Sequence, residues 1–325
     1  MSHDPPTSRL SRLLQAVAWV ALCFALAVGW AVWPHSRIGA MATVVLVLFA
    51  YAPVMAIELV LLRCVHGQDP APRPTWGELA AAWWAEVLQA PRVFAWRQPF
   101  AWRRWPDTAV GDSSTSGARG RAVVFIHGFV CNRAFWHPWM KALRRVGIPY
   151  ASVSLEPVFG SIDETLGQVE EAVSRAERAT GLAPVLVCHS MGGLVARAWL
   201  AQSAASATRV HRIVTIGTPH RGTWLARFSH LPNGRQMRQG CDWLSQLAAR
   251  EQAAHAAGAY QSFVCWYSNA DNVVFPASTA TLPGADNRLV RGTAHVALAF
   301  HPRVMWESLS MVASAESSPM DRTAS

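Results

Sequence analysis

The feature that most constrains this chain is a pair of long apolar runs close to its N-terminus. Leu13–Trp33 is 21 residues without a charge. As a helix this run would be about 31 Å long, enough to cross the hydrocarbon core of a bilayer. Ile38–Leu62 is a second run of 25 residues, interrupted only by one proline and one glutamate, and a short polar turn joins the two. The pattern predicts a transmembrane helical hairpin over residues 1–66.

Two other interpretations of these runs are open. Arg9 and Arg12 would suit the basic region of a cleaved signal peptide. Against this, the first run is longer than a typical signal core, lacks a clear small-residue cleavage site and is followed at once by the second run. Two buried core helices are disfavoured because neither run has a polar face. We interpret Glu58, in the second run, as a structural residue that faces the partner helix or reaches the membrane interface.

The arginines that flank the two runs indicate on which side of a membrane the rest of the chain lies. Arg9 and Arg12 precede the first run, Arg63 and Arg73 follow the second, and the turn holds only Arg37. A hairpin leaves both of its ends on one side, and positively charged flanks favour the cytoplasm. We therefore expect an integral membrane protein whose main domain is cytoplasmic.

Tryptophan and arginine are concentrated just after the hairpin. Nine of the 16 tryptophans precede Pro106, and six of these lie between Thr75 and Trp105 together with four arginines. Both side chains suit the headgroup layer of a membrane, so residues 67–120 are predicted to form an interfacial segment and linker. The alternative is a helix that packs on the main domain with its tryptophans as core. The net charge of +9 would also suit single-stranded nucleic acid, but attachment to two membrane spans argues against that partner.

Residues 121–325 have the pattern of a different architecture, and a Gly/Ser-rich stretch over residues 106–121 leads into them as a linker. Short apolar, β-branched runs alternate there with segments of helical periodicity. Strands are predicted at residues 122–126, 149–155, 184–188, 210–216, 262–267 and 288–290. Such alternation implies an α/β domain with a mostly parallel sheet and helices on both faces.

A candidate nucleophile lies between one of these strands and the next helix, in the motif C-H-S-M-G-G at residues 188–193. A serine on a sharp strand-to-helix turn is exposed above the sheet, and the turn requires small residues two positions before and after it. Gly192 meets this requirement, whereas Cys188 replaces the usual first glycine. We predict that Ser190 is a catalytic nucleophile, with an ordinary helix N-cap as the alternative.

Three other loops supply candidate partners for this serine. H-G-F at residues 127–129 follows the first strand, so the N–H groups of Phe129 and Met191 are predicted to form an oxyanion hole. Asp271 lies in a loop after a strand, and His295 follows the last strand. We expect His295 to act as the general base and Asp271 to orient it. Asp242 and Asp286 are the alternative acids.

These segments together resemble the bacterial triacylglycerol lipase and esterase branch of the α/β-hydrolases. The matching pieces are V-V-F-I-H-G-F at residues 123–129, V-C-H-S-M-G-G-L at 187–194, I-G-T-P-H-R-G-T at 216–223, S-N-A-D-N-V-V at 268–274 and G-T-A-H at 292–295. The resemblance implies an α/β-hydrolase domain over residues 121–325 with a cap at about 224–258. Met237, Trp243 and Leu244 of that cap would be acyl-pocket residues. It also points to a bacterial inner membrane as the location.

The sequence therefore predicts a membrane-anchored serine hydrolase that cleaves lipid esters through an acyl-serine intermediate. This chemistry needs no cofactor and no metal, and the cysteines have no zinc-like spacing. An acyltransferase that uses the same Ser190–Asp271–His295 site is the alternative, because access of water decides between the two reactions. A membrane scaffold with an inactive hydrolase fold is a third interpretation, which the complete triad disfavours.

Overall fold

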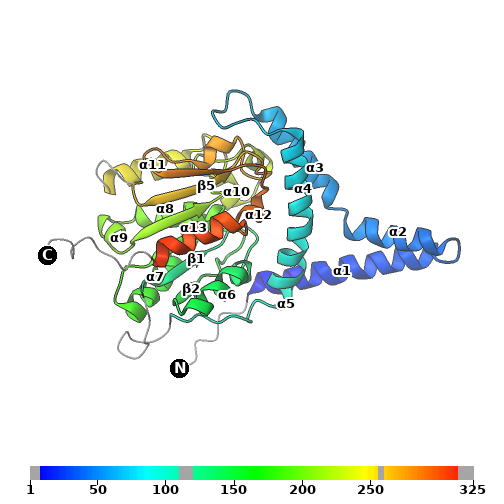
Figure 1. The fold of residues 1–325 in the computed structure, drawn as a ribbon, viewed down its shortest axis with the longest axis horizontal. Helices are drawn as coiled ribbons and strands as arrows, with labels where there is room; N and C mark the ends of the chain where they lie inside the picture. The colour runs from blue at the N-terminus through cyan, green and yellow to red at the C-terminus, as the bar shows by residue number, and fades with distance from the viewer. Residues whose placement is uncertain (1–7, 110–119, 255–259, 314–325) are drawn as a thin grey trace, which may run out of the picture.

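The structure is a computed structural model that describes residues 8–109, 120–254 and 260–313. The centre is a six-stranded, wholly parallel sheet with the strand order β2-β1-β3-β4-β5-β6 (Figure 1). The strands are β1 (Val123–Ile126), β2 (Tyr150–Ser152), β3 (Val185–His189), β4 (Arg212–Ile216), β5 (Phe263–Ser268) and β6 (Asp286–Val290). All six predicted strands are present, and the parallel sheet is confirmed.

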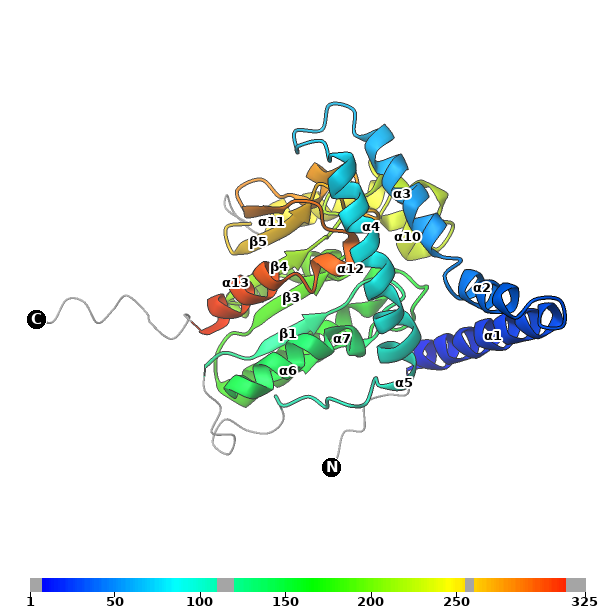
Figure 2. The ribbon, with the colours of Figure 1, turned by 45° about the vertical axis from the view of Figure 1, so that its right-hand side comes forward.

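Alternate residues of each strand enter two different cores, because neighbouring side chains of a strand point to opposite faces. Val124 and Ile126 of β1 pack with α7 (Leu166–Thr180) and α8 (Met191–Leu200). Val123 and Phe125 pack on the other face with α6 (His137–Val146) and α13 (Pro302–Ala313). Helices therefore cover both faces of the sheet (Figure 2).

The strand order contains a switch point, at which β1 has β2 on one side and β3 on the other. The chain leaves β1 toward β2 on one side, and β3 pairs with β1 on the other side. In open parallel sheets, ligands bind outside the carboxyl ends of the strands at such a switch point. The loops that carry Phe129 and Ser190 follow β1 and β3, so the topology brings both to this point.

Shorter elements complete this domain. After β4 come a 3₁₀ turn (Trp224–Phe228), α10 (Pro232–Gln236) and α11 (Asp242–Ala254), and α12 (His295–Leu298) follows β6. The start of the predicted linker, residues 107–109, is hydrogen-bonded to the α/β domain. Thr108 and Ala109 donate backbone hydrogen bonds to Tyr150, and Asp107 accepts hydrogen bonds from Arg133 and Ser152. Residues 110–119 of that stretch lie outside the described residues.

The N-terminal part forms a separate group of helices. They are α1 (Arg9–Val32), α2 (Arg37–Leu48), α3 (Ala52–Val65), α4 (Trp76–Ala90), a π-helical turn (Pro91–Arg97) and the short α5 (Gln98–Phe100). Figure 1 shows α1 and α2 projecting side by side from the α/β domain, while α4 crosses the base of this projection and lies next to α3.

Within the described part of the chain, α1 is the one straight helix that is long and apolar enough to cross a membrane. The second apolar run is not one straight helix, because α2 and α3 are bent by 47° at a short break. Pro53 stands at the start of α3, where its ring disfavours a helical residue before it. A second membrane span exists only if the bent pair is counted as one.

Candidate active site

Ser190 stands at the sharp turn between β3 and α8, where the sequence placed it. Its backbone has φ 54° and ψ −128°, a left-handed conformation that costs a non-glycine residue of order 1–3 kcal/mol. The Ser190 N–H donates a 2.9 Å hydrogen bond to the Ile216 carbonyl at the end of β4, which helps to hold the turn. A strained strand-to-helix turn of this kind is the backbone context in which a nucleophilic serine is exposed above a sheet.

Gly128 shows how closely the first loop approaches this serine. A Cβ atom at position 128 would lie 2.7 Å from the Ser190 Cβ, closer than side-chain carbons pack. A glycine is therefore needed for the loop that carries Phe129 to lie against the nucleophile. The Met191 N–H belongs to the first residue of α8, directly after Ser190. Both residues of the predicted oxyanion hole thus flank Ser190 in space.

The structure brings Asp271 and His295 into contact. The His295 Nδ1 lies 2.9 Å from the Asp271 Oδ2, and both side chains are buried. The other carboxylate oxygen of Asp271 accepts hydrogen bonds from the Val273 and Val274 N–H groups at 2.9 and 2.8 Å. Asp271 is therefore held in place by hydrogen bonds from its own loop. Because it contacts the Nδ1 of His295, the Nε2 of that ring is available for another partner.

Gly217 connects this pair to the serine loop. It follows Ile216, whose carbonyl binds the Ser190 N–H. A Cβ at position 217 would lie 3.0 Å from the Asp271 Oδ2 and 3.1 Å from the His295 Nδ1, and the residue has a φ of +56°. The Asp271–His295 pair therefore lies against the strand end that holds Ser190.

The electrostatics of His295 fit a general base. Burial acts to lower its pKa, but the charge and hydrogen bond of Asp271, together with the charges of Glu86 and Glu58, outweigh this effect, so the pKa of His295 is raised above its usual value. The alternative acids lie elsewhere. Asp242 begins α11, and Asp286 in β6 forms a 2.6 Å ion pair with Arg288.

Two further histidines support the site without belonging to the triad. His127 accepts the Leu155 N–H at its Nε2 (3.0 Å), so its Nδ1 carries the proton that it donates to the Gly128 carbonyl (2.9 Å). Burial lowers the pKa of His127 to about 4, which keeps it neutral. The Nε2 of His189 lies 3.2 Å from the His295 carbonyl, and the two rings pack at 4.6 Å. His127 thus orders the loop of Phe129, and His189 supports His295.

Two glutamates reach this site from the N-terminal helices, and the sequence assigned neither of them to it. Glu86 of α4 accepts hydrogen bonds from the Val296 and Ala297 N–H groups, both at 2.9 Å. Glu58 of α3 accepts a 2.6 Å hydrogen bond from the Asn272 side chain. The interpretation of Glu58 as a residue that faces a partner helix or the membrane interface is therefore wrong. A carboxylate in an apolar run needs a donor, and Asn272 beside Asp271 provides it.

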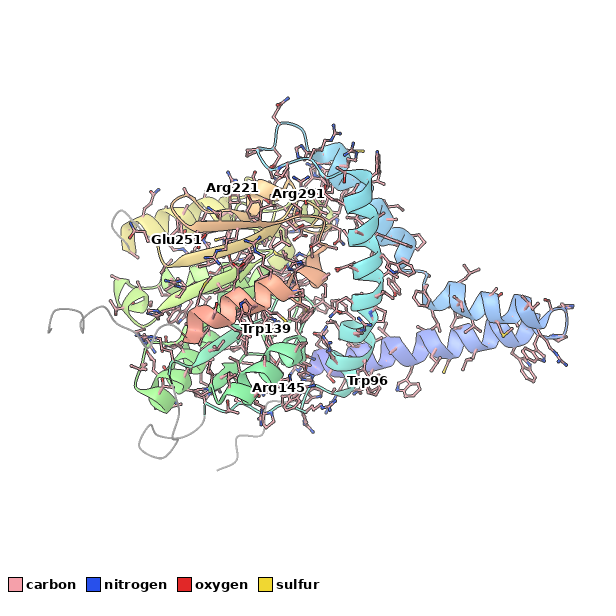
Figure 3. All side chains as sticks on the ribbon, viewed as in Figure 1. Trp96, Trp139, Arg145, Arg221, Glu251 and Arg291 are labelled. Atoms are coloured by element: carbon pink, nitrogen blue, oxygen red, sulfur yellow. The ribbon has the colours of Figure 1, made fainter. Side chains whose placement is uncertain are left out.

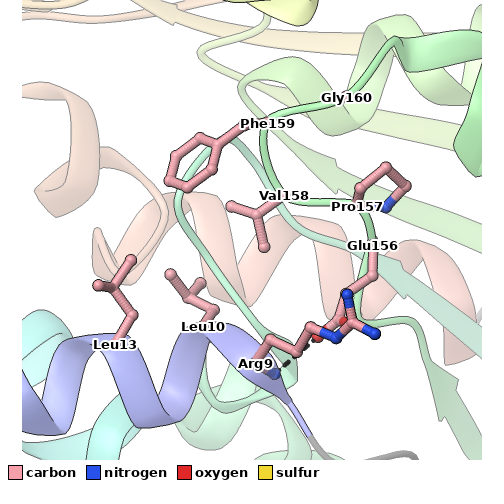
Figure 4. A pocket seen from close by; sticks show the side chains of 8 residues that line it. All are labelled: Arg9, Leu10, Leu13, Glu156, Pro157, Val158, Phe159 and Gly160. Atoms are coloured by element: carbon pink, nitrogen blue, oxygen red, sulfur yellow. Dashed lines mark hydrogen bonds between the residues drawn. The ribbon is translucent and has the colours of Figure 1, made fainter.

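A cavity of about 610 Å³ lies beside the oxyanion loop, between the first turns of α1 and the loop that follows β2 (Figure 4). Its lining is mostly apolar and consists of Arg9, Leu10, Leu13, Glu156, Pro157, Val158, Phe159 and Gly160. The Phe159 ring packs edge-on against the Phe129 ring at 5.9 Å, so the cavity adjoins the candidate oxyanion hole.

The predicted acyl-pocket residues of the cap do not line this cavity. Met237 and Leu244 are buried in the core on the α7–α8 side of the sheet. The Trp243 indole N–H donates to the Asp163 carboxylate at 2.7 Å. Within the residues that the structure describes, no group of three or more His, Cys, Asp or Glu side chains could hold a metal ion.

Comparison with known proteins supports the fold. A family model described as "Domain of unknown function (DUF7379)" matches residues 89–259, just over half of the chain. No curated protein sequence matches. The mature lipase BlEst2 of Bacillus licheniformis is similar in structure, with a TM-score of 0.52 and 16% identity over 63% of this chain and 96% of the lipase.

Lipase B of Aspergillus fumigatus is a second similar structure, with a TM-score of 0.50 and 13% identity. The match covers 63% of this chain and 54% of the fungal enzyme, so it spans about half the length of that protein. At these identities the likeness shows the fold alone. The α/β domain therefore has the α/β-hydrolase fold of these lipases.

Proposed function

The chain belongs to the DUF7379 family, and we propose that this protein is a membrane-anchored serine hydrolase that cleaves carboxylic esters of lipids. The observation that carries the proposal is the buried 2.9 Å contact between Asp271 and His295 beside the strained turn of Ser190. Residues 121–325 would be the catalytic domain, with residues 1–66 as its anchor and 67–120 as an interfacial segment.

The proposed reaction uses the three side chains in the manner of a serine hydrolase. The His295 Nε2 takes the proton of the Ser190 hydroxyl, whose oxygen attacks the ester carbonyl. The imidazolium that forms is stabilised by Asp271 and then protonates the departing alcohol. Water, activated by the same imidazole, hydrolyses the acyl-serine and regenerates the hydroxyl.

The Phe129 and Met191 N–H groups are proposed to bind the oxyanion of each tetrahedral intermediate. Loss of one such donor costs about 10²–10³-fold in rate in other hydrolases. Because Gly128 lies against Ser190 and Met191 follows it, both amides are near the carbon that the serine would attack.

The exposed apolar surface supports membrane attachment. Among the exposed large apolar side chains of the hairpin, Trp30 and Ile38 are 78% and 77% exposed. A further stripe of exposed apolar side chains on α4, the π-helical turn and α5 consists of Trp76, Trp84, Leu88, Trp96 and Phe100. Since α4 crosses the base of the α1–α2 projection (Figure 1), a membrane that holds the hairpin would meet this stripe at its surface. The flanking arginines favour the cytoplasmic face.

The position of the apolar cavity supports a lipid substrate. The cavity lies between the first turns of the proposed membrane helix and residues 156–160, and Phe159 of its lining contacts the Phe129 ring. An acyl chain that leaves the bilayer beside α1 would reach the candidate oxyanion hole along Leu10, Leu13 and Phe159.

A fluorophosphonate probe tests the proposal directly. We expect it to label Ser190 in the membrane-bound wild type, and Ser190→Ala to lose both labelling and hydrolysis of p-nitrophenyl esters while its thermal unfolding is unchanged. Ser174→Ala, which removes a serine of α7 that contacts Glu170 and Arg209 and no residue of the site, serves as the control. Ester hydrolysis that survives in Ser190→Ala would rule the mechanism out. Product analysis with an added alcohol separates hydrolysis from acyl transfer.

A further inference from the structure

Three consecutive backbone N–H groups at the catalytic histidine are bound by side chains. The His295 N–H donates to the Asn272 Oδ1 at 3.1 Å. The next two N–H groups, of Val296 and Ala297, donate to the two carboxylate oxygens of Glu86, both at 2.9 Å. The segment that carries His295 is therefore held along its length by groups that belong to other elements.

Glu86 is well suited to fix this segment. Its side chain is 2% exposed, and each oxygen has one backbone donor. A carboxylate is costly to bury unless its hydrogen bonds are satisfied, and bonds from backbone N–H groups to a charged acceptor are stronger than neutral ones. Any movement of His295 relative to α4 would break these bonds inside the protein, where water does not replace them.

Glu58 acts on the same segment through one intermediate. Its carboxylate accepts the Asn272 amide N–H at 2.6 Å, and the other end of that amide accepts the His295 N–H. Because Asn272 also follows Asp271 directly, this contact holds the loops of both the acid and the base. Two helices that precede the catalytic domain thus reach the triad by separate routes, α3 through Glu58 and α4 through Glu86.

We propose that Glu86 and Glu58 are positioning residues of the catalytic histidine, so that α3 and α4 are a structural part of the active site. This inference rests on the proposed function, because it takes His295 as the general base. It assigns α3, the last part of the predicted hairpin, and α4 a role besides attachment. It also means that the alignment of His295 depends on how α3 and α4 sit against the triad loops.

The kinetic test compares Glu86→Gln, Glu86→Ala and Glu58→Ala with the matched control Glu171→Gln, an exposed glutamate of α7. We expect kcat for a soluble ester to fall by roughly 10-fold to 100-fold in Glu86→Ala. The KM should change little, because neither glutamate lines the cavity or reaches Ser190. Glu86→Gln keeps one oxygen acceptor, so its loss of kcat should be smaller than that of Glu86→Ala.

A pH profile separates positioning from general destabilisation. The charged groups that face the His295 imidazole are Asp271, Glu86 and Glu58, and its neighbour His189 is held neutral by burial. Burial raises the pKa of Glu86 to about 7, so its charge is present at and above neutral pH. There it favours the imidazolium of His295, and Glu86→Gln should move the acid limb of kcat/KM to lower pH. A variant that merely unfolds more easily would lose activity without moving this limb.

Hydrogen exchange gives a readout that does not depend on turnover. In the full-length protein in detergent, we expect peptides that span residues 295–298 to exchange faster in Glu86→Ala than in the wild type, with the β3–α8 peptides unchanged. Unchanged exchange at 295–298 together with unchanged kcat would overturn the inference even in an active hydrolase. Faster exchange in a protein that hydrolyses no ester would instead contradict the proposed function alone.

Discussion

The N-terminal helices and the α/β domain use the same apolar residue types in opposite ways. In the α/β domain, Trp136 and Trp139 are fully buried between the sheet and the helices on one face. In the hairpin, Trp30 is 78% exposed. Figure 3 shows this contrast for Trp139, which lies under α13, and Trp96, which lies at the outer side of the helical group. An exposed apolar surface marks a site of contact with a membrane or another protein, which is why membrane attachment is proposed for the N-terminal helices.

Two glutamates of each region show the reverse contrast. Glu171 and Glu307 of the α/β domain form ion pairs at the surface, whereas Glu58 and Glu86 of the N-terminal helices turn inward to the loops of the candidate triad. The helical region therefore presents apolar side chains to the outside and polar ones to the catalytic domain. This arrangement is expected of a region that touches a membrane on one side and supports a polar site on the other.

The largest expected effect is on the free energy of unfolding, and it comes from a substitution in the buried core of the α/β domain. Trp139→Ala removes an indole that is fully buried and donates a 2.8 Å hydrogen bond to the Ala299 carbonyl. We expect a loss of about 3–5 kcal/mol in the free energy of unfolding. Trp30→Ala should leave the unfolding of the α/β domain within about 0.5 kcal/mol of the wild type. Denaturant unfolding in detergent measures both, and equal losses would contradict the division into two regions.

The pH dependence of ester hydrolysis tests the electrostatics of the buried site. His295 must be neutral to accept the proton of Ser190, and Asp271 raises its pKa above the usual value after outweighing burial. Hydrolysis should therefore fall as the pH decreases through that raised pKa, by about tenfold for each pH unit below it. The rate of hydrolysis of a soluble ester, measured from pH 5 to 9, gives the position of this acid limb. A limb clearly below pH 6 would show that Asp271 does not act on His295 in this way.

The smallest expected effect concerns the exposed stripe on α4. Trp84→Ala and Trp96→Ala each remove one ring from a surface that many residues share, so each should weaken surface contact only a few-fold. We expect slower hydrolysis of esters presented in vesicles and unchanged hydrolysis of a soluble ester. Phe159→Ala, in the cavity, is the contrasting variant, and it should affect long-chain esters in both settings. Equal effects of Trp96→Ala on both substrates would show that the stripe packs inside the protein instead.

Much of the α/β domain was predictable because its signals are local. Apolar β-branched runs and the helices between them gave all six strands, although β2 is shorter than the run at 149–155. The order of motifs placed Ser190, Asp271 and His295 at strand ends, which in a parallel sheet lie at one edge. The substitution of Cys188 for the usual glycine caused no conflict, because it is buried in the core beside β1 and β4.

The N-terminal region was predictable in composition and less so in shape. The apolar run at 13–33 became one straight helix, but the run at 38–62 bends between α2 and α3. The Trp/Arg-rich segment forms α4 and the elements after it, and α4 packs on the α/β domain. Several of its tryptophans are exposed and are not core, and their contact with a membrane stays a proposal. Leu79, Ala82 and Val87 pack inward, and the stripe that begins at Trp76 faces outward.

The sequence by itself predicted which residues carry the candidate chemistry and which segments are apolar, because both follow from residue type and short-range spacing. Only the tertiary structure decided which side chains support His295. Glu86 and Val296 are 210 residues apart, and no periodicity links a glutamate on an early helix to a backbone N–H group in a late loop. Their contact exists because α4 packs across the carboxyl edge of the sheet, and a buried carboxylate is stable there only when it finds donors.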